Sequence, residues 1–216
     1  MASYSAVVFD LGGVLLDWDP RHLYRKLFGG DEAAMERFLD QVCTPRWHAA
    51  QDLGRTTAQA CGELAARYPG QAGLIWAWGQ RSEEMVAGPI AGSVAILADL
   101  KSRGVTCYAL SNMEAETFPL RLLRFGFLRC FDGYVISGLE GMAKPDPRIY
   151  RLLLERYGLS AGHTLFIDDL AGNVAAARAV GMCAVRFESP PALRAQLESK
   201  GLLAARGPAG PDQTGE

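Results

Sequence analysis

The sequence lacks cysteine pairs at the C-x-x-C spacing, and it lacks a long uninterrupted apolar run. Its five cysteines are odd in number and widely spaced, which argues against a disulfide framework or a zinc knuckle and favours a reducing compartment. No stretch reaches the length of a membrane-spanning helix, and Asp10 interrupts the only candidate for an apolar export signal. We therefore expect a cytoplasmic protein with no membrane partner.

An excess of charge of either sign is absent too. The chain has 22 basic and 24 acidic residues, which gives a formal net charge of -2. This balance gives no electrostatic reason to expect nucleic acid as a partner, so a small molecule is the default. The composition, with 49% hydrophobic and 21% charged residues, is typical of a globular protein. It leaves open whether the protein is a monomer or a homodimer.

Short apolar segments alternate with helical patterns along much of the chain. The segments that indicate buried parallel strands are Ser5 to Phe9, Val105 to Leu110, Thr164 to Ile167 and Cys183 to Phe187. The patterns that indicate helices between and after them are Ser93 to Arg103, Arg148 to Tyr157 and Ala171 to Val180. This alternation predicts right-handed crossovers and an α/β fold, in which a Rossmann-like parallel sheet carries helices on both faces.

The strand signal vanishes between Asp17 and Gly88, where helical patterns follow one another. These patterns are Arg21 to Phe28, Asp31 to Cys43, Thr56 to Tyr68 and Gln71 to Val86. We predict a helical cap at 17–88, inserted into a core made of 1–16 and 89–206. Asp31 and Thr56 are suited to cap helix N-termini, and Trp76 is expected to pack inside the cap. The segment 207–216 has no apolar pattern and is predicted to be a disordered tail.

Polar residues follow several of the predicted strands. Asp10 ends the first strand and is followed by Gly12 and Gly13. The later polar positions are Ser111 and Asn112, then Lys144, then Asp168, Asp169 and Asn173. Because the carboxyl ends of parallel strands meet at one edge of a sheet, we expect these side chains to converge.

The converging residue types suit phosphoryl transfer. Carboxylates such as Asp10, Asp168 and Asp169 are hard oxygen ligands, which Mg²⁺ prefers. A hydroxyl at Ser111 and an ammonium at Lys144 suit the oxygens of a phosphoryl group. A carboxylate that faces a phosphoryl group and a metal ion can act as a nucleophile, because the metal offsets the repulsion between two anions.

Four short segments follow one another along the chain in this order: Phe-Asp-Leu-Gly-Gly-Val, Leu-Ser-Asn, Lys-Pro-Asp-Pro-Arg-Ile-Tyr and Phe-Ile-Asp-Asp-x-x-x-Asn. They resemble the four motifs of the haloacid dehalogenase-like (HAD) hydrolase superfamily, over about Ser5 to Phe187. The spacing is similar to that of members with a helical cap between the first and second motifs. The chain most resembles the branch that holds bacterial glucose-1-phosphate phosphatases and the amino-terminal phosphatase domain of soluble epoxide hydrolases.

The resemblance implies a role for each matching residue. Asp10 would be the nucleophile, and Lys144 would serve catalysis and phosphate binding. The phosphoryl oxygens would be held by Ser111, the Asn112 backbone amide and Lys144. The Mg²⁺ site would be formed by Asp10, the Gly12 carbonyl and the Asp168-Asp169 pair, of which Asp169 would be the direct ligand. Asp168 and Asn173 would then tune the metal and orient Lys144 or a water.

The sequence departs from this pattern at Gly12, where phosphatases of the family usually carry an aspartate as general acid and base. Such catalysis contributes a factor of roughly 10² to 10⁴ in rate. Asp17, Asp19 and His48 are possible replacements, although a turn explains the two aspartates and packing explains the histidine more simply. Cap residues that could contact a substrate are Trp47, Gln51, Arg55 and Arg81, and packing or solvation accounts for each at least as well.

The sequence thus predicts a Mg²⁺-dependent phosphatase that hydrolyses a small phosphorylated metabolite, with sugar phosphates among the candidates, through an aspartyl-phosphate intermediate. A 2-haloacid dehalogenase is the first alternative. Gly12 permits that chemistry, but the Asp168-Asp169 pair has no use in it. A catalytically weak protein that binds a phosphorylated ligand as a regulator is the second alternative.

Overall fold

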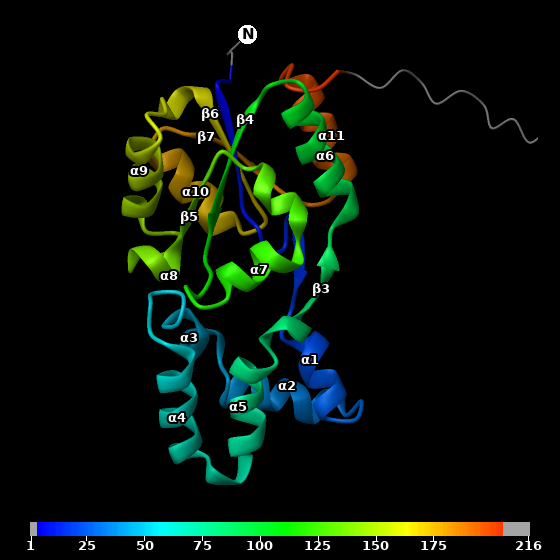
Figure 1. Ribbon diagram of the computed structural model, residues 1–216, viewed down its shortest axis with the longest axis vertical. Helices are drawn as coiled ribbons and strands as arrows, with labels where there is room; N and C mark the ends of the chain where they lie inside the picture. Colours follow the sequence, from blue (N-terminus) through cyan, green and yellow to red (C-terminus); the bar gives the residue numbers. More distant parts are fainter. Residues whose placement is uncertain (1–3, 205–216) are drawn as a thin grey trace, which may run out of the picture.

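The computed structural model describes residues 4–204, and its centre is a five-stranded sheet (Figure 1). The sheet has the order β5-β4-β1-β6-β7, and every neighbouring pair is parallel. Its strands are β1 (Ala6–Phe9), β4 (Thr106–Ser111), β5 (Gly133–Ile136), β6 (Thr164–Asp168) and β7 (Cys183–Arg186). The parallel pairing confirms the Rossmann-like sheet that the sequence predicts.

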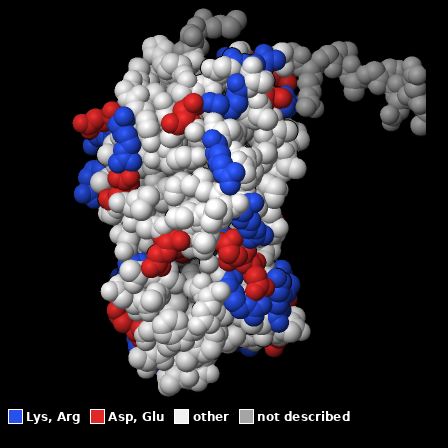
Figure 2. All heavy atoms as spheres, viewed as in Figure 1, with Lys and Arg blue, Asp and Glu red and all other residues white. Residues whose placement is uncertain are grey.

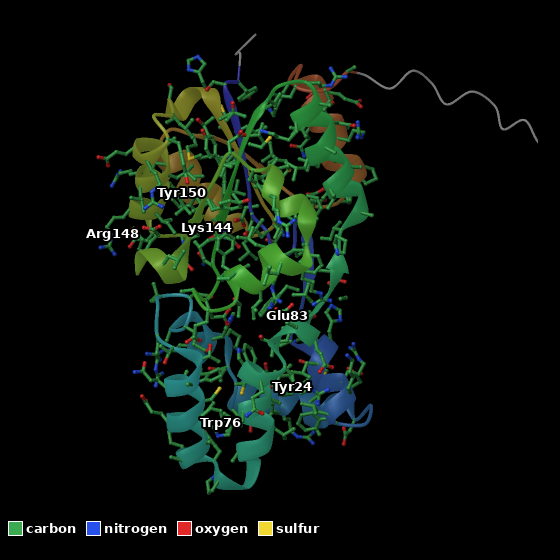
Figure 3. The ribbon with its side chains drawn as sticks, viewed as in Figure 1. Tyr24, Trp76, Glu83, Lys144, Arg148 and Tyr150 are labelled. Carbon is green, nitrogen blue, oxygen red and sulfur yellow. The ribbon has the colours of Figure 1, made fainter. Side chains whose placement is uncertain are left out.

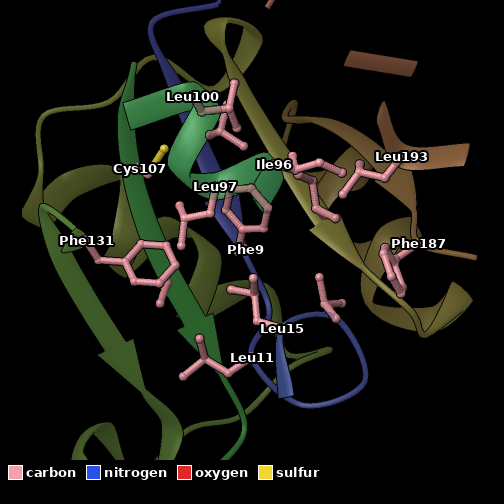
Figure 4. Packing of buried hydrophobic residues seen from close by; sticks show 14 of the residues in the cluster. Phe9, Leu11, Leu15, Ile96, Leu97, Leu100, Cys107, Phe131, Phe187 and Leu193 are labelled. Atoms are coloured by element: carbon pink, nitrogen blue, oxygen red, sulfur yellow. The ribbon is translucent and has the colours of Figure 1, made fainter. Parts of the chain in front are cut away.

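Helices cover both faces of this sheet. They are α6 (Ala91–Ser102), α7 (Phe118–Arg124), α8 (Ser137–Glu140), α9 (Pro147–Arg156), α10 (Ala171–Ala179) and α11 (Pro190–Ser199), with short 3-10 turns η3 (Gly126–Cys130) and η4 (Ala161–His163). Alternate residues of β1 point to opposite faces. Phe9 packs in a cluster with Ile96 of α6 and Leu193 of α11 (Figure 4), whereas Val8 packs with Ile149 of α9. Each face therefore buries its own apolar layer.

The chain between β1 and β4 leaves the sheet and forms a separate group of helices at the end toward which β4 points (Figure 1). We call residues 17–88 the helical segment. Its elements, including the strand that leads into it, are β2 (Leu16–Trp18), α1 (Arg21–Leu27), α2 (Glu32–Gln41), α3 (Pro45–Ala49), α4 (Thr57–Arg67), η1 (Pro69–Gln71), α5 (Ala72–Gln80), η2 (Ser82–Met85) and β3 (Val86–Pro89).

The helical segment has an apolar cluster of its own. Tyr24, Phe38 and Trp78 pack together in it, and Trp76 is partly buried against it (Figure 3). Packing is therefore the role of Trp76 in this structure.

The start of α2 lies where the sequence indicates, since the Asp31 side chain accepts a hydrogen bond of 2.9 Å from the Ala34 amide.

The structure corrects the expectation that no strand occurs between Asp17 and Gly88. Strands β2 and β3 pair antiparallel where the chain enters and leaves the helical segment. Both strands are too short to show an alternating apolar pattern. Each is extended because it forms backbone hydrogen bonds with the other. The helix expected over Gln71 to Val86 is shorter than predicted and ends at Gln80. The 3-10 turn η2 follows it, and Val86 is already extended and pairs with Trp18. The predicted tail at 207–216 lies outside the described residues.

On the face seen in Figure 2, acidic and basic side chains are interspersed. Within residues 4–204, none of the helices combines the length and the apolar character that crossing a bilayer requires.

Strand β5, which the sequence analysis did not identify, depends on a glycine. A Cβ atom added at Gly133 would meet the Tyr157 ring, whose hydroxyl accepts from the Tyr134 amide at 2.8 Å and donates to the Tyr134 carbonyl at 2.9 Å. We expect Gly133→Ala to lower the free energy of unfolding by about 2 kcal/mol, as overpacking does.

Urea denaturation measures this change. Gly162→Ala is the matched control, since a Cβ there meets nothing within 4 Å. We expect this control to alter the free energy of unfolding by less than about 0.5 kcal/mol. Equal effects of the two substitutions would contradict the crowding at Gly133.

Candidate active site

A buried lysine links two carboxylates at the carboxyl edge of the sheet. Lys144 Nζ lies 2.8 Å from Asp10 Oδ2 and 2.7 Å from Asp168 Oδ2. Asp10 directly follows β1, Asp168 ends β6, and Lys144 precedes α9. The lysine side chain is only 1% exposed, in the sheet half of the molecule (Figure 3). Three segments far apart in the sequence therefore meet at one ammonium group.

Lys144 and Asp10 shift one another's pKa values, and the charge of Asp168 affects both. Burial alone would lower the pKa of Lys144, but the carboxylates of Asp10 and Asp168 raise it above its usual value. Burial raises the pKa of Asp10 to about 7, Lys144 opposes this shift, and Asp168 adds to it. The two carboxylates thus favour the charged form of Lys144, and Lys144 in turn favours the ionised form of Asp10.

Two asparagines hold these charged groups in place. The Asn112 side chain donates a 2.9 Å hydrogen bond to the Lys144 carbonyl and accepts one of 2.8 Å from the Lys144 amide. Asn173 Nδ2 lies 3.0 and 3.1 Å from the two oxygens of Asp168. The Leu170 amide adds a 2.9 Å hydrogen bond to Asp168. The Asp168 carboxylate is thereby fixed in orientation.

A third carboxylate completes the group. Oxygens of Asp10, Asp168 and Asp169 all lie within 4.8 Å of one another. Gly13 makes this approach possible, because it has φ +71° and a Cβ atom on it would lie 2.6 Å from Asp169 Oδ2. Three carboxylates face one ammonium here, so the surplus negative charge and the oxygen donors suit a divalent cation such as Mg²⁺.

These groups open into a cavity of about 440 Å³ between the sheet half and the helical segment. The predicted site residues that line it are Asp10, Gly12, Ser111, Asn112, Lys144, Asp169 and Asn173, whereas Asp168 is buried behind Lys144. The helical segment contributes Trp18, His48 and Asp52 to the same cavity. A small molecule that enters would touch both halves of the protein.

Space is left at Gly12. A Cβ atom added there would meet only the Trp18 Cβ, at 4.0 Å. The chain therefore omits a side chain that the backbone could carry without a clash.

The four predicted contact residues of the helical segment lie outside the lining of this cavity among the described residues. Trp47 packs against Trp78 and donates to the Ala60 carbonyl at 3.3 Å. Arg55 pairs with Glu63, Arg81 pairs with Glu84, and Gln51 is fully buried. Asp19 does line the cavity, and Asp17 instead contacts His22.

Sequence reasoning did not identify Asp52 and Glu114, which surround His48. His48 Nε2 lies 3.0 Å from Glu114 Oε1 and 3.8 Å from Asp52 Oδ1. Asp52 follows His48 at the i, i+4 spacing that brings side chains together on a helix, which was a usable signal. Glu114 comes from the sheet half, so its contact with His48 depends on the tertiary fold.

Comparison with known proteins gives consistent matches. The profile of the haloacid dehalogenase-like hydrolases matches residues 4–181. The chain is 31% identical over 181 residues to the sesquiterpene phosphatase astK of Aspergillus oryzae, which covers 83% of this chain and 88% of the relative. It is 29% identical to acyl-CoA dehydrogenase family member 10 of the mouse, over 91% of this chain and 19% of that protein. The chain thus spans about a fifth of this second relative.

Solved structures have the same fold. A HAD-like family hydrolase from Porphyromonas gingivalis is 25% identical, with a TM-score of 0.68 over 91% of this chain and 98% of that one. A HAD family enzyme from Bacteroides thetaiotaomicron, in complex with magnesium and inorganic phosphate, is 22% identical, with a TM-score of 0.65 over 87% of this chain and 96% of that one.

Removal of the central ammonium should destabilise the fold in a pH-dependent way. In Lys144→Met, Asp10 and Asp168 stay buried without their cation. We expect a loss of roughly 3 to 5 kcal/mol in the free energy of unfolding at pH 8 in chelator. Without Lys144 the pKa of folded Asp10 rises further above its unfolded value, so the loss should shrink as the pH falls to 5 and the acid takes up a proton.

Denaturant unfolding at the two pH values measures this difference. Lys101→Met is the matched control, because Lys101 pairs with Asp132 near the surface and should cost less than about 1 kcal/mol. A pH-independent loss in Lys144→Met would argue against the buried charge cluster.

Proposed function

Because this chain belongs to the haloacid dehalogenase-like hydrolase family, we propose that it is a phosphatase that hydrolyses a small phosphorylated metabolite with the help of Mg²⁺. We also propose that 17–88 acts as a cap over a core formed by 1–16 and 89–206. The observation that carries the proposal is the buried Lys144 ammonium beside three convergent carboxylates in a cavity of about 440 Å³. The phosphatase name of the Aspergillus oryzae relative and the magnesium and phosphate complex of the Bacteroides structure support it.

In this proposal each group of the site has a task. Asp10 attacks phosphorus, so that a bond forms between a carboxylate oxygen and phosphorus while the bond to the leaving oxygen breaks. The phosphoryl oxygens are bound by Lys144, the Ser111 hydroxyl and the Asn112 backbone amide. Water then hydrolyses the aspartyl-phosphate, which releases inorganic phosphate and restores Asp10.

The donor set fits Mg²⁺. Asp10, Asp169 and the Gly12 carbonyl would hold the ion directly, and Asp168 would add its charge from behind Lys144. When bound, it would offset the repulsion between the Asp10 carboxylate and an anionic substrate. Asn112 and Asn173 would keep Lys144 and Asp168 in position through the hydrogen bonds described above.

The wall contributed by the helical segment indicates the kind of substrate. Opposite the acidic edge of the sheet, the cavity is lined by apolar side chains such as Leu16, Trp18 and Val86 together with charged or ionisable ones such as Arg21, His48 and Asp52. Its volume suits a metabolite rather than a macromolecule. A phosphate ester with an apolar or amphipathic organic part fits this lining, and sugar phosphates, whose faces stack on aromatic rings, remain candidates.

A direct test is the hydrolysis of p-nitrophenyl phosphate and of a panel of metabolite phosphates. We expect turnover that chelator abolishes and added Mg²⁺ restores. Asp10→Asn should lower kcat by roughly 10³-fold or more, because the nucleophile is lost. Asp17→Asn is the control, since Asp17 lies outside the cavity lining and contacts His22.

The alternatives give different results in the same experiment. Chloride release from 2-haloacids in the presence of chelator would identify a dehalogenase instead. Binding of phosphorylated ligands without turnover of any substrate would identify a regulatory protein.

A further inference from the structure

An alkyl phosphate presents a difficulty for the groups at the sheet edge. Its leaving alkoxide requires a proton, yet Asp168 is held by Lys144 and Asn173, and Asp10 is the proposed nucleophile. Gly12 carries no side chain. Asp169 and Lys144 are assigned to the metal ion and to the phosphoryl oxygens in the proposed function, so we expect the proton donor elsewhere on the cavity wall.

A cluster of ionisable side chains lies on the wall opposite the sheet edge. His48 comes from α3, Asp52 follows one helical turn later, and Glu114 lies beyond β4 in the sheet half. The side chains are 17%, 10% and 14% exposed, and all three residues line the cavity that Asp10 lines. The cluster is thus nearly buried and still open toward a bound substrate.

The His48 ring packs on Trp18, the residue that also neighbours Gly12. It stacks on the Trp18 ring, with centroids 5.2 Å apart and planes 17° from parallel. The Cβ of the same Trp18 is the atom that a side chain at position 12 would approach. Trp78 also packs on His48, with centroids 5.1 Å apart and planes 53° from parallel. The two tryptophans thereby hold the imidazole in the wall of the cavity that Asp10 and Gly12 also line.

Electrostatics favour a protonated imidazole. Burial lowers the pKa of His48, but the hydrogen bond to Glu114 and the charge of Asp52 oppose this and raise it above the usual value. Burial raises the pKa of Asp52 to about 6, and Lys144 opposes this shift together with His48. The Thr117 hydroxyl donates to Glu114, and Arg121 is close enough for its charge to interact with Glu114.

Within the proposed phosphatase, on which this step rests, we propose that His48 is the general acid and base that replaces the carboxyl group absent at Gly12, and that Glu114 and Asp52 position it. Its substrates would then include phosphate esters of alcohols, whose alkoxides leave only when protonated.

In the proposed first step, Asp10 displaces the alcohol from phosphorus. An oxygen of Asp10 bonds to phosphorus, the bond from phosphorus to the alkyl oxygen breaks, and its electron pair stays on that oxygen. The His48 imidazolium gives this oxygen its proton, which yields the free alcohol and a neutral imidazole. Neutral His48 then takes a proton from the water that attacks phosphorus, the bond to Asp10 breaks, and phosphate leaves.

The test compares two leaving groups. We expect His48→Gln to lower kcat/KM for an alkyl phosphate by roughly 10² to 10⁴. For p-nitrophenyl phosphate, whose phenolate leaves without a proton, the loss should be far smaller, so the ratio of the two losses is the readout. His22→Gln is the matched control, because His22 lies outside the cavity lining.

A second variant tests for rescue. Since a Cβ at position 12 meets only Trp18 at 4.0 Å, Gly12→Asp should fit. In the His48→Gln background it should restore the kcat/KM for the alkyl phosphate by roughly tenfold or more, because it supplies a new acid.

Glu114→Gln tests the positioning role. It removes the negative charge that helps to raise the pKa of His48 and leaves a neutral, weaker acceptor in its place. The alkyl phosphate rate needs protonated His48 and falls as the pH rises through that pKa, so this limb of the pH profile should move to lower pH.

Equal losses for both leaving groups in His48→Gln, or no rescue by Gly12→Asp, would overturn the role of His48. Absence of any p-nitrophenyl phosphate turnover in the unaltered protein would instead overturn the proposed phosphatase activity.

Discussion

The buried ion pairs of Lys144 are the constraint on which the rest of the site depends. An ammonium that is 1% exposed is stable only if carboxylates surround it, and Asp10 and Asp168 do so at 2.8 and 2.7 Å. This requirement ties the end of β1, the end of β6 and the loop before α9 to one point. Asn112 then fixes the Lys144 backbone. The arrangement that stabilises the fold is therefore the same one that concentrates charge for chemistry.

Strands β1, β4, β6 and β7 of the central sheet and the residues at its edge could be predicted from the sequence because they follow from local rules, whereas the edge strand β5 was missed. Apolar runs define buried strands, parallel strands end at one edge, and Asp10, Asp168 and Lys144 follow from that. Strands β2 and β3 follow no local rule, since Leu16 and Pro89 pair across the whole helical segment. Their strand character comes from the partner, which a linear pattern does not contain.

Local sequence patterns are likewise insufficient to predict which residues of the helical segment are available at the cavity. Arg55 and Arg81 were plausible substrate contacts by residue type, yet they pair with Glu63 and Glu84. His48 was a plausible acid by type alone, and its partner Glu114 lies in the other half of the protein. Other contacts between the halves, such as Arg121 with Glu83, likewise join distant residues. Residue types predict which groups are capable of chemistry, and only the tertiary contacts decide which are available for it.

Placing the acid on the helical segment has a physical consequence. An aspartate at position 12 would move with the nucleophile, because both belong to the loop after β1. His48 instead depends on the contact between the two halves, through Glu114 on one side and Trp18 and Trp78 on the other. In the proposed mechanism, opening of the helical segment would separate His48 from Asp10, so esters that need a proton would react only when the halves are together. Leaving groups that need no proton are free of that requirement.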